Sequence, residues 1–274
     1  MRLFILITQN LINMAGLDFE EGATFKDSFK GINSPANKLP RGSAIIRKPG
    51  NDIQPNEKYV AGYVRFGKDG KILGPDWNTV TEFEKQIAAF FGAPYAVAVD
   101  SCTHAVELCL RYRKTSIINC PRNTYISIPM LANKLGIKLE FSLRSWTDYY
   151  SVDFGNLIYD AAVLWRKDSY IQNTFMCLSF QYQKHLSLGR GGMILCPDKE
   201  SYDQLKKMSY DGRLPGIPWR EQNIDTMGFH YYMQPETAAL GLQKLEAAIN
   251  TPPRKWVYTD WPDLTQMTVF KNNL

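Results

Sequence analysis

The sequence predicts an α/β fold, because short buried strands alternate along the chain with segments of helical periodicity. Residues 95–99 form an uninterrupted apolar run of strand length, and a helix-like segment begins immediately after it. Residues 175–178 and 193–196 are two further apolar runs, separated by a polar turn that contains three glycines. Runs without polar positions are typical of buried strands, so we expect a sheet that lies among helices.

Length and composition are those of an ordinary globular protein. The 274 residues suffice for one large core, or for one core with a small appendage. Hydrophobic residues make up 45% of the chain and charged residues 22%, which is typical of soluble domains. The net charge of +5 is scattered and forms no basic block, so a nucleic acid partner gains little support.

The five cysteines indicate a reduced, cytoplasmic protein. Their number is odd and none are spaced as C-x-x-C, so neither a disulfide framework nor a metal site is indicated. The first seven residues faintly resemble a signal peptide, but polar residues interrupt the apolar run early. No later apolar segment is long enough to span a membrane.

The first 73 residues are expected to form an irregular arm. Prolines and glycines break any long element there, which leaves only short strands such as residues 59–64. The pattern then sharpens: Thr79 and Thr81 each stand three residues before a glutamate, which predicts a helix with two possible capping boxes. We expect this helix to end at Gly92.

A tight turn follows the strand at 95–99, and a helix opens at Asp100-Ser101-Cys102-Thr103. Such a turn points backbone N–H groups and a partial positive charge outward, which makes a phosphate site. The simpler alternative is plain N-capping of the helix by Asp100 or Ser101. The turn alone leaves both interpretations open.

Three further segments lead to an acidic residue. We expect a strand at 117–121, a helix from about Pro129 that ends at Gly136, and a strand at 138–141. The next apolar strand ends in Asp160. Because a buried carboxylate is costly unless it is paired, Asp160 is either a helix cap or the partner of a buried cation.

Residues 175–192 place one lysine, Lys184, on the turn between two buried strands. Most lysines are solvated surface residues, but this one has Ser179 five positions before it and a glycine-rich turn behind it. Amphipathic helices are expected at 200–209 and at 235–249.

These motifs resemble those of the DegT/DnrJ/EryC1/StrS family, sugar aminotransferases that use pyridoxal phosphate. The family's lysine segment has the form S-F-x-x-x-K-x-L-x-x-G-x-G-G, which residues 179–192 fit without a gap. Asp160-Ala161-Ala162 matches the family's D-A-A motif, and residues 228–246 resemble its G-Y-N-Y-R-M segment and the helix after it. The resemblance covers about residues 74–249.

The resemblance implies the large domain of a type I pyridoxal phosphate-dependent aminotransferase. That domain is a three-layer sandwich whose mostly parallel central sheet is flanked by helices. The implied organisation is an arm at 1–73, the cofactor-binding domain at 74–250, and a short tail at 251–274 where relatives carry a small domain. The resemblance also implies a homodimer whose active sites are shared between subunits.

The resemblance further implies a reaction and its central residues. An amino group, usually from glutamate, would move to a keto sugar linked to a nucleotide. Lys184 would hold the cofactor as a Schiff base and move the proton, and Asp160 would pair with the protonated ring nitrogen. Tyr125 would stack on the pyridine ring.

The cofactor phosphate would lie at the turn that begins at Ser101. By resemblance the phosphate contacts are Ser101, Cys102, Thr103 and Ser179. Cys102 takes the place of the family's glycine, which restricts how closely the backbone approaches the phosphate. His230 takes the place of an asparagine that reaches a neighbouring subunit's phosphate, and a histidine can still donate to it.

Two alternatives remain open. Related enzymes use the same fold to dehydrate sugars with a histidine in place of the lysine; Lys184 argues against this, although His185 stands beside it. A non-catalytic or regulatory protein that kept the fold is the other alternative. Departures from the family pattern favour it somewhat, at Cys102, Val163, His230 and Tyr232. Neither G-x-G-x-x-G nor a P-loop is present, so a dinucleotide or nucleoside triphosphate enzyme is not indicated.

Overall fold

The computed structural model describes residues 65–66, 72–73 and 77–271, and the chain divides into two compact units, residues 1–74 and 75–274. In the first unit, β1 (Arg65–Phe66) pairs antiparallel with β2 (Ile72–Leu73). The strand expected at 59–64 lies outside the described residues.

A five-stranded sheet forms the centre of the second unit. Its strand order is β3 (Tyr95–Val99), β9 (Gly192–Cys196), β8 (Phe175–Ser179), β7 (Ile158–Asp160) and β6 (Tyr150–Ser151). Beside β6 lies a parallel pair, β4 (Ile117–Pro121) and β5 (Lys138–Ser142). The Asn119 N–H on β4 donates to the Val152 carbonyl at 2.9 Å, which links this pair to the edge of the larger sheet.

Neighbouring strands of the five-stranded sheet are mostly antiparallel, so the expectation of a mostly parallel sheet is wrong in this respect. Only β7 and β8 pair in parallel, whereas β9 runs against both of its neighbours and β6 runs against β7. Short connections account for two of the antiparallel pairs, because one hairpin loop joins β8 to β9 and another joins β6 to β7. Strands β3, β7 and β8 nevertheless share one direction, so their carboxyl ends lie at the same edge.

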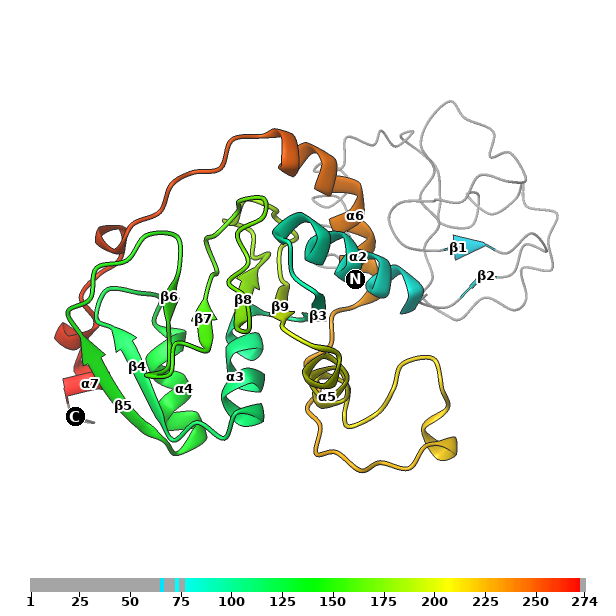
Figure 1. Cartoon of the computed structure of the whole chain (residues 1–274), viewed down its shortest axis with the longest axis horizontal. Coiled ribbons are helices and arrows are strands. Elements are labelled where there is room, and N and C mark those ends of the chain that lie inside the picture. The colour runs from blue at the N-terminus through cyan, green and yellow to red at the C-terminus, as the bar shows by residue number, and fades with distance from the viewer. Residues whose placement is uncertain (1–64, 67–71, 74–76, 272–274) are drawn as a thin grey trace, which may run out of the picture. The chain divides into compact units, whose positions relative to one another are not determined.

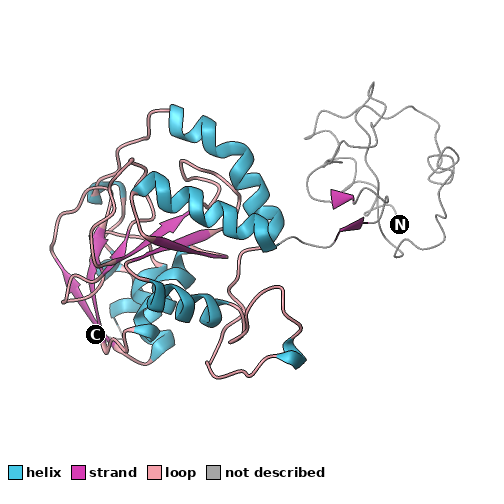
Figure 2. Ribbon diagram, turned by 45° about the vertical axis from the view of Figure 1, so that its right-hand side comes forward, coloured by secondary structure: helices cyan, strands magenta, loops and turns pink. Residues whose placement is uncertain are grey.

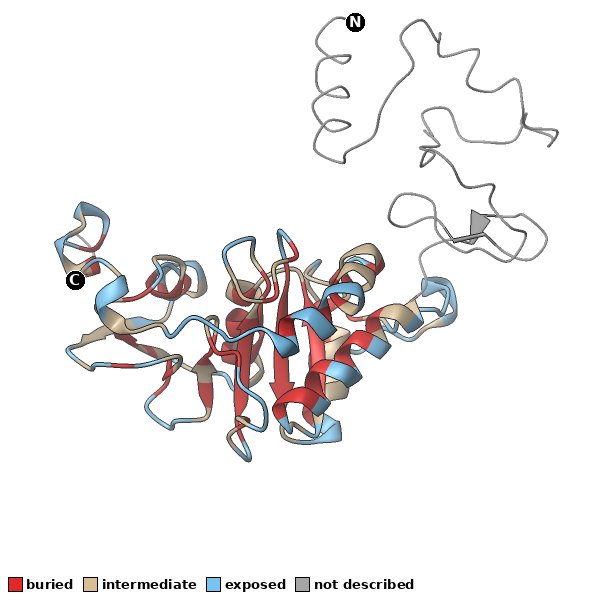
Figure 3. Ribbon diagram, turned by 90° about the horizontal axis from the view of Figure 1, so that it is seen from above, coloured by how far each residue is buried: buried red, intermediate tan, exposed pale blue. Residues whose placement is uncertain are grey.

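Helices cover both faces of the sheet, which confirms the three-layer α/β architecture (Figures 1 and 2). Helices α2 (Trp77–Phe91) and α6 (Pro235–Asn250) cover one face. The other face is covered by α3 (Cys102–Tyr112), α4 (Ser127–Leu135) and α5 (Lys199–Ser209). Burial confirms the division, because strand residues are buried between helices whose outer sides are exposed (Figure 3).

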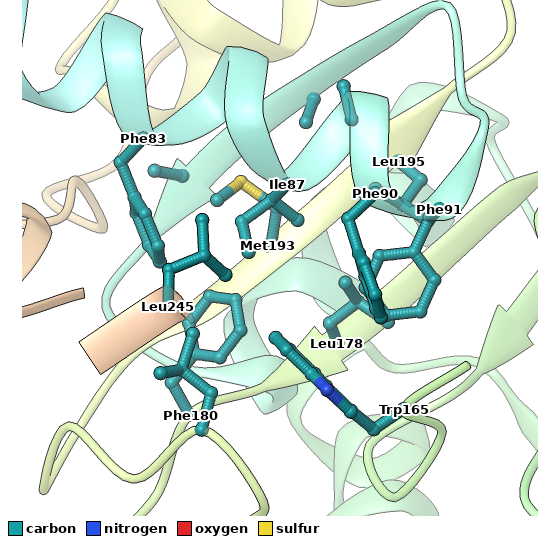
Figure 4. Close-up of a cluster of buried hydrophobic side chains, with 14 of the residues drawn as sticks. Phe83, Ile87, Phe90, Phe91, Trp165, Leu178, Phe180, Met193, Leu195 and Leu245 are labelled. Atoms are coloured by element: carbon teal, nitrogen blue, oxygen red, sulfur yellow. The ribbon is translucent and has the colours of Figure 1, made fainter. Parts of the chain in front are cut away.

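Alternate residues of each strand enter two separate cores. On β3, Ala96 and Ala98 face α2 and α6, whereas Val97 and Val99 face α3. The first core is rich in aromatic rings, with Phe90 stacked on Trp165 at a centroid distance of 4.8 Å (Figure 4). Because both faces of the central strands are packed, the residues at the ends of these strands are held in fixed positions.

The start of α3 and the end of α4 follow the signals predicted from the sequence, whereas the start of α2 does not. Ser101 caps α3 by accepting from the His104 N–H at 3.2 Å, and Gly136 ends α4 with φ at 64°. The capping boxes predicted at Thr79 and Thr81 are wrong, because α2 begins earlier, at Trp77. The Trp77 ring packs edge-on against Tyr210 and Tyr232, and these contacts stabilise the additional helical turn.

Residues 251–266, here called the C-terminal strap, leave α6 and run back across the unit to β4 and β5 (Figure 1). Main-chain hydrogen bonds fasten the strap: Tyr258 N donates to Trp146 O at 3.1 Å, and Leu264 N donates to Arg122 O at 2.8 Å. Leu264 is fully buried. Within the part of the chain that the structure describes, no helix is long and apolar enough to cross a membrane.

Candidate active site

A pocket of about 200 Å³ lies at the carboxyl ends of β7 and β8, beside the first turn of α3. Such an edge is where α/β folds bind ligands. The structure brings together here seven of the eight residues predicted from the sequence: Ser101, Cys102, Thr103, Tyr125, Asp160, Ser179 and Lys184. A larger, open groove of about 800 Å³ at the far end of α3 contains none of them.

Lys184 enters the pocket from the loop that joins β8 to β9. The hairpin pattern continues into this loop, since Phe180 N donates to Gly191 O at 2.9 Å. Burial lowers the pKa of Lys184 below its usual value, and the negative charge of Asp160 partly opposes this. A larger share of the amine is therefore neutral, which is the nucleophilic form.

His185 does not compete with Lys184 for the site. Its Nε2 lies 2.8 Å from the Ala248 carbonyl on α6, so the imidazole must carry the proton there and donate it. His185 also packs against Trp165 of the first core and does not line the pocket. The open question of whether lysine or histidine faces the site is thus answered in favour of Lys184.

Asp160 is a buried carboxylate that lacks a cationic partner. One oxygen, Oδ1, accepts from the Ala162 N–H at 3.0 Å, and the other, Oδ2, accepts from the Tyr150 hydroxyl at 2.6 Å. Among the described residues, no lysine, arginine or histidine forms an ion pair with it. Burial raises the pKa of Asp160, although these hydrogen bonds and the charge of Lys184 lower it in part. A bound cation would relieve the cost of this burial.

The first turn of α3 faces the pocket as a possible anion site. Ser101 and Thr103 line the pocket, and the Thr103 hydroxyl also meets Ser127 Oγ at 2.8 Å. The strand β9 approaches this turn closely: a Cβ on Gly192 would lie 2.4 Å from the Ser101 carbonyl carbon. Only glycine permits this approach, so position 192 requires a glycine.

Cys102 contributes its backbone rather than its thiol to this turn. Its Sγ points into the protein, where it donates to the Cys177 carbonyl at 3.2 Å and lies 3.9 Å from Asp160 Oδ1. Burial and the charge of Asp160 raise the pKa of this thiol well above its usual value. A side chain at this position therefore fits, although relatives have glycine there.

An arginine stands over the same helix start. Arg190 donates to Asp100 Oδ2 at 2.7 Å, and His104 Nδ1 lies 2.6 Å from Asp100 Oδ1. Burial acts to raise the pKa of Asp100, but the hydrogen bonds and charges of His104 and Arg190 hold it below its usual value. The ionised carboxylate thus fixes Arg190, a pocket-lining cation, at the edge of the possible anion site.

Aromatic rings form the outer side of the pocket. Tyr125 lines it with 54% of its surface exposed and packs edge-on against Trp261 of the C-terminal strap. Trp256 and Trp261 each have a ring centroid 5.6 Å from Lys184 Nζ. The strap therefore supplies part of the wall beside the reactive amine.

His230 is the one predicted site residue that does not line this pocket. Its ring is exposed and its Nδ1 lies 3.0 Å from Asp211 Oδ2 of the same chain. The predicted contact with a neighbouring subunit concerns a second chain, so it stays a prediction.

Sequence reasoning missed several residues of the site, namely Thr124, Trp146, Tyr150, Arg190, Trp256 and Trp261. Tyr150 carries no motif, because it follows another tyrosine in a segment of no clear period. The two tryptophans in the short polar segment after residue 250 could have predicted that the strap packs on the domain, because large aromatic side chains in such segments usually pack against other residues.

The residues present fit pyridoxal phosphate. A buried carboxylate without a cation suits a protonated pyridine nitrogen, and a lysine of lowered pKa suits attachment to an aldehyde. The helix start with its serine and threonine hydroxyls suits the phosphate group.

Solved structures with the same fold include a putative sugar aminotransferase and a putative PLP-dependent aminotransferase. AtS13 of Actinomadura melliaura aligns with a TM-score of 0.53 at 21% identity, over 62% of this chain and 60% of that one. The putative sugar aminotransferase Spr1654 of Streptococcus pneumoniae, in its PLP form, aligns with a TM-score of 0.53 at 17% identity, over 64% and 60%. Spr1654 is also known in apo and PMP forms.

The chain belongs to the DegT/DnrJ/EryC1/StrS aminotransferase family, whose model matches residues 67–141 and 171–255. The spore coat polysaccharide biosynthesis protein SpsC of Bacillus subtilis is 28% identical in an alignment of 219 residues that covers 61% of this chain and 56% of SpsC. The chain thus spans just over half the length of this curated relative. The sequence-based family assignment and its cofactor, pyridoxal phosphate, are confirmed at the level of the family. The match omits 142–170, the segment that carries Tyr150 and Asp160.

Proposed function

We propose that this protein is a pyridoxal phosphate-dependent aminotransferase that moves an amino group, with glutamate as donor, to a keto sugar linked to a nucleotide. The observation that carries the proposal is that Lys184 and Asp160 line one pocket, where burial lowers the pKa of the lysine and raises the pKa of the aspartate. Family membership and the sugar aminotransferases among the similar structures support a sugar as acceptor.

The bound cofactor supplies an electron sink, which stabilises negative charge on the carbon that carries the amino group. Lys184 Nζ would hold the cofactor covalently and, once an incoming amine had released it, would move a proton between that carbon and the ring side as general base and acid. Burial serves both roles, because it favours the neutral amine that attacks and accepts protons.

The other pocket residues bind and orient. Asp160 accepts a hydrogen bond from the ring N–H and keeps that nitrogen protonated. The α3 turn, with the hydroxyls of Ser101, Thr103 and Ser179, holds the phosphate. Tyr125 covers one side of the ring and limits the entry of water.

The proposal includes a homodimer in the cytoplasm. His230 is exposed and outside its own chain's pocket, so it is available to reach the cofactor phosphate of a second subunit. The five cysteines are all free and buried, which supports a reducing compartment.

The experiment that tests the function separates the two halves of the reaction. Protein loaded with pyridoxal phosphate is mixed with glutamate, and the absorbance band of the lysine-bound cofactor should give way to that of pyridoxamine phosphate. Addition of a keto sugar nucleotide should restore the original band. Lys184→Ala is the matched inactive control. If a panel of amino donors leaves the band of folded, loaded protein unchanged, the non-catalytic alternative replaces this proposal.

A further inference from the structure

Two tryptophans of the C-terminal strap border the space in front of the reactive amine. Lys184 Nζ lies 5.6 Å from the ring centroids of both Trp256 and Trp261. The two indoles are stacked on each other, with centroids 5.9 Å apart and planes 27° apart. Together they form an aromatic surface beside Nζ, the nitrogen that must exchange a proton with the reacting carbon of the acceptor.

We propose that Trp256 and Trp261 form the wall on which the sugar ring of the amino acceptor binds, with the Trp261 indole N–H donating to a sugar hydroxyl. The inference rests on the proposed aminotransferase function and assigns it two substrate-binding residues. Both lie beyond residue 255, where the match to the family model ends.

Distance supports contact with the acceptor. A carbon that exchanges a proton with Nζ must approach it to about 3–3.5 Å. The ring that bears this carbon then extends into the space that the two indole faces border at 5.6 Å. A sugar ring offers an apolar face of C–H groups, which matches an aromatic surface, and a rim of hydroxyls, which needs donors and acceptors.

An unpaired donor on Trp261 supports the second contact. Its Nε1 is buried and has no hydrogen-bond partner among the described residues. Trp146, a pocket neighbour, shows the usual arrangement instead, since its Nε1 donates to the Asn123 carbonyl at 2.8 Å. Buried indole N–H groups are normally satisfied, so a hydrogen bond to a sugar hydroxyl would remove the cost of this unpaired donor on a pocket-lining ring.

The wall is held in place by the strap's main chain. The Asn123 side-chain amide donates to the Trp261 carbonyl at 3.0 Å, and Asp148 N donates to the Trp256 carbonyl at 3.1 Å. Trp261 also packs against Tyr125 and Trp146. The rings are therefore positioned before the acceptor binds, which reduces the entropic cost of binding.

The test uses binding as well as turnover. Cofactor-free protein is titrated with dTDP-glucose, which carries an intact sugar ring and cannot react, and with dTDP alone, while calorimetry records the affinity. Trp261→Ala and Trp256→Ala should weaken dTDP-glucose binding about tenfold and leave dTDP binding unchanged. Trp261→Phe keeps the ring and removes only the donor, so it should show a smaller loss. Trp219→Ala, an exposed tryptophan outside the pocket, is the matched control.

The same variants are then followed in the two half-reactions. The half-reaction with the keto sugar nucleotide should need about tenfold more acceptor, a larger change than any in the concentration of glutamate that the first half-reaction needs. The inference is overturned if wild type, Trp261→Phe and Trp261→Ala bind dTDP-glucose with equal affinity. It is also overturned if the alanine variants lose as much affinity for dTDP as for dTDP-glucose, because the wall would then bind the base. Failure of the wild-type glutamate step contradicts the proposed function instead, and the titration still decides the role of the wall.

Discussion

The Tyr150 hydroxyl donates a 2.6 Å hydrogen bond to Oδ2 of Asp160. Its single proton is used there, so the Thr124 hydroxyl, 2.6 Å from the Tyr150 oxygen, must be the donor in that second contact. All three side chains are buried. The chain from Thr124 through Tyr150 to Asp160 thus stabilises a carboxylate at the bottom of the pocket and fixes its direction.

Tyr150→Phe is expected to weaken cofactor binding by roughly tenfold at neutral pH, since a hydrogen bond to a charged group contributes about 1.5–3 kcal/mol. The Tyr150 bond lowers the pKa of Asp160, so its loss raises that pKa further. Cofactor affinity should therefore begin to fall at a higher pH in the variant as the solution is acidified. Fluorescence titrations with pyridoxal phosphate over a pH series measure this, and an unchanged pH profile contradicts the role given to Tyr150.

Asp160→Asn is expected to have opposite effects on stability and on binding. Burial raises the pKa of Asp160 above its usual 3.8, so its ionised form destabilises the cofactor-free fold as the pH rises. The variant without cofactor should thus be more stable to urea than wild type at neutral pH, with a difference that shrinks toward pH 3.8. Its affinity for the cofactor should fall strongly. Asp148→Asn, at another carboxylate of the pocket, should change neither.

Gly192→Ala is expected to damage the phosphate site. The added Cβ would lie 2.6 Å from the Cys102 nitrogen and would push β9 away from the first turn of α3. Overpacking of this kind typically costs about 1–3 kcal/mol, and cofactor affinity should fall with it. Gly136→Ala is the control, because its φ of 64° is unfavourable for alanine but no atom lies within 4 Å of the added Cβ. That variant should lose stability and keep its affinity for the cofactor.

His230→Ala is expected to weaken cofactor binding without unfolding the subunit, because its exposed ring contributes little to the core. Sedimentation of the wild type should show a homodimer. Asp211→Asn removes the same-chain partner of His230 and serves as the control, since it frees the ring rather than deleting it. A stable monomer with undiminished affinity for pyridoxal phosphate is the outcome that rules out a shared site.

Local signals predicted most of the fold. Ser101 caps α3 and Gly136 ends α4 because both signals act within one helical turn. Strand direction was not accessible in this way: an apolar run looks the same whether its neighbours are parallel or antiparallel. The start of α2 was missed because Trp77 is held by Tyr210 and Tyr232, which are far away in the sequence.

The same distinction applies to the pocket. Lys184 and Asp160 stand in short motifs whose spacing is visible in the sequence, whereas Tyr150 and Trp261 belong to the site only through tertiary contacts. The hydrogen bond that fixes the Trp261 carbonyl spans 138 positions. No periodic pattern over a window of a few turns can predict a partner at that separation.

Borohydride trapping of the bound cofactor shows whether Lys184 is the residue that holds it. The protein is saturated with pyridoxal phosphate and reduced with borohydride, and its peptides are mapped by mass spectrometry. Lys244→Ala is the control for the nearby lysine that donates to the Ser187 carbonyl, and it should label as the wild type does. We expect one pyridoxyl group per chain, on Lys184, and none in Lys184→Ala. A label on another lysine, or no label on folded wild-type protein, would contradict it.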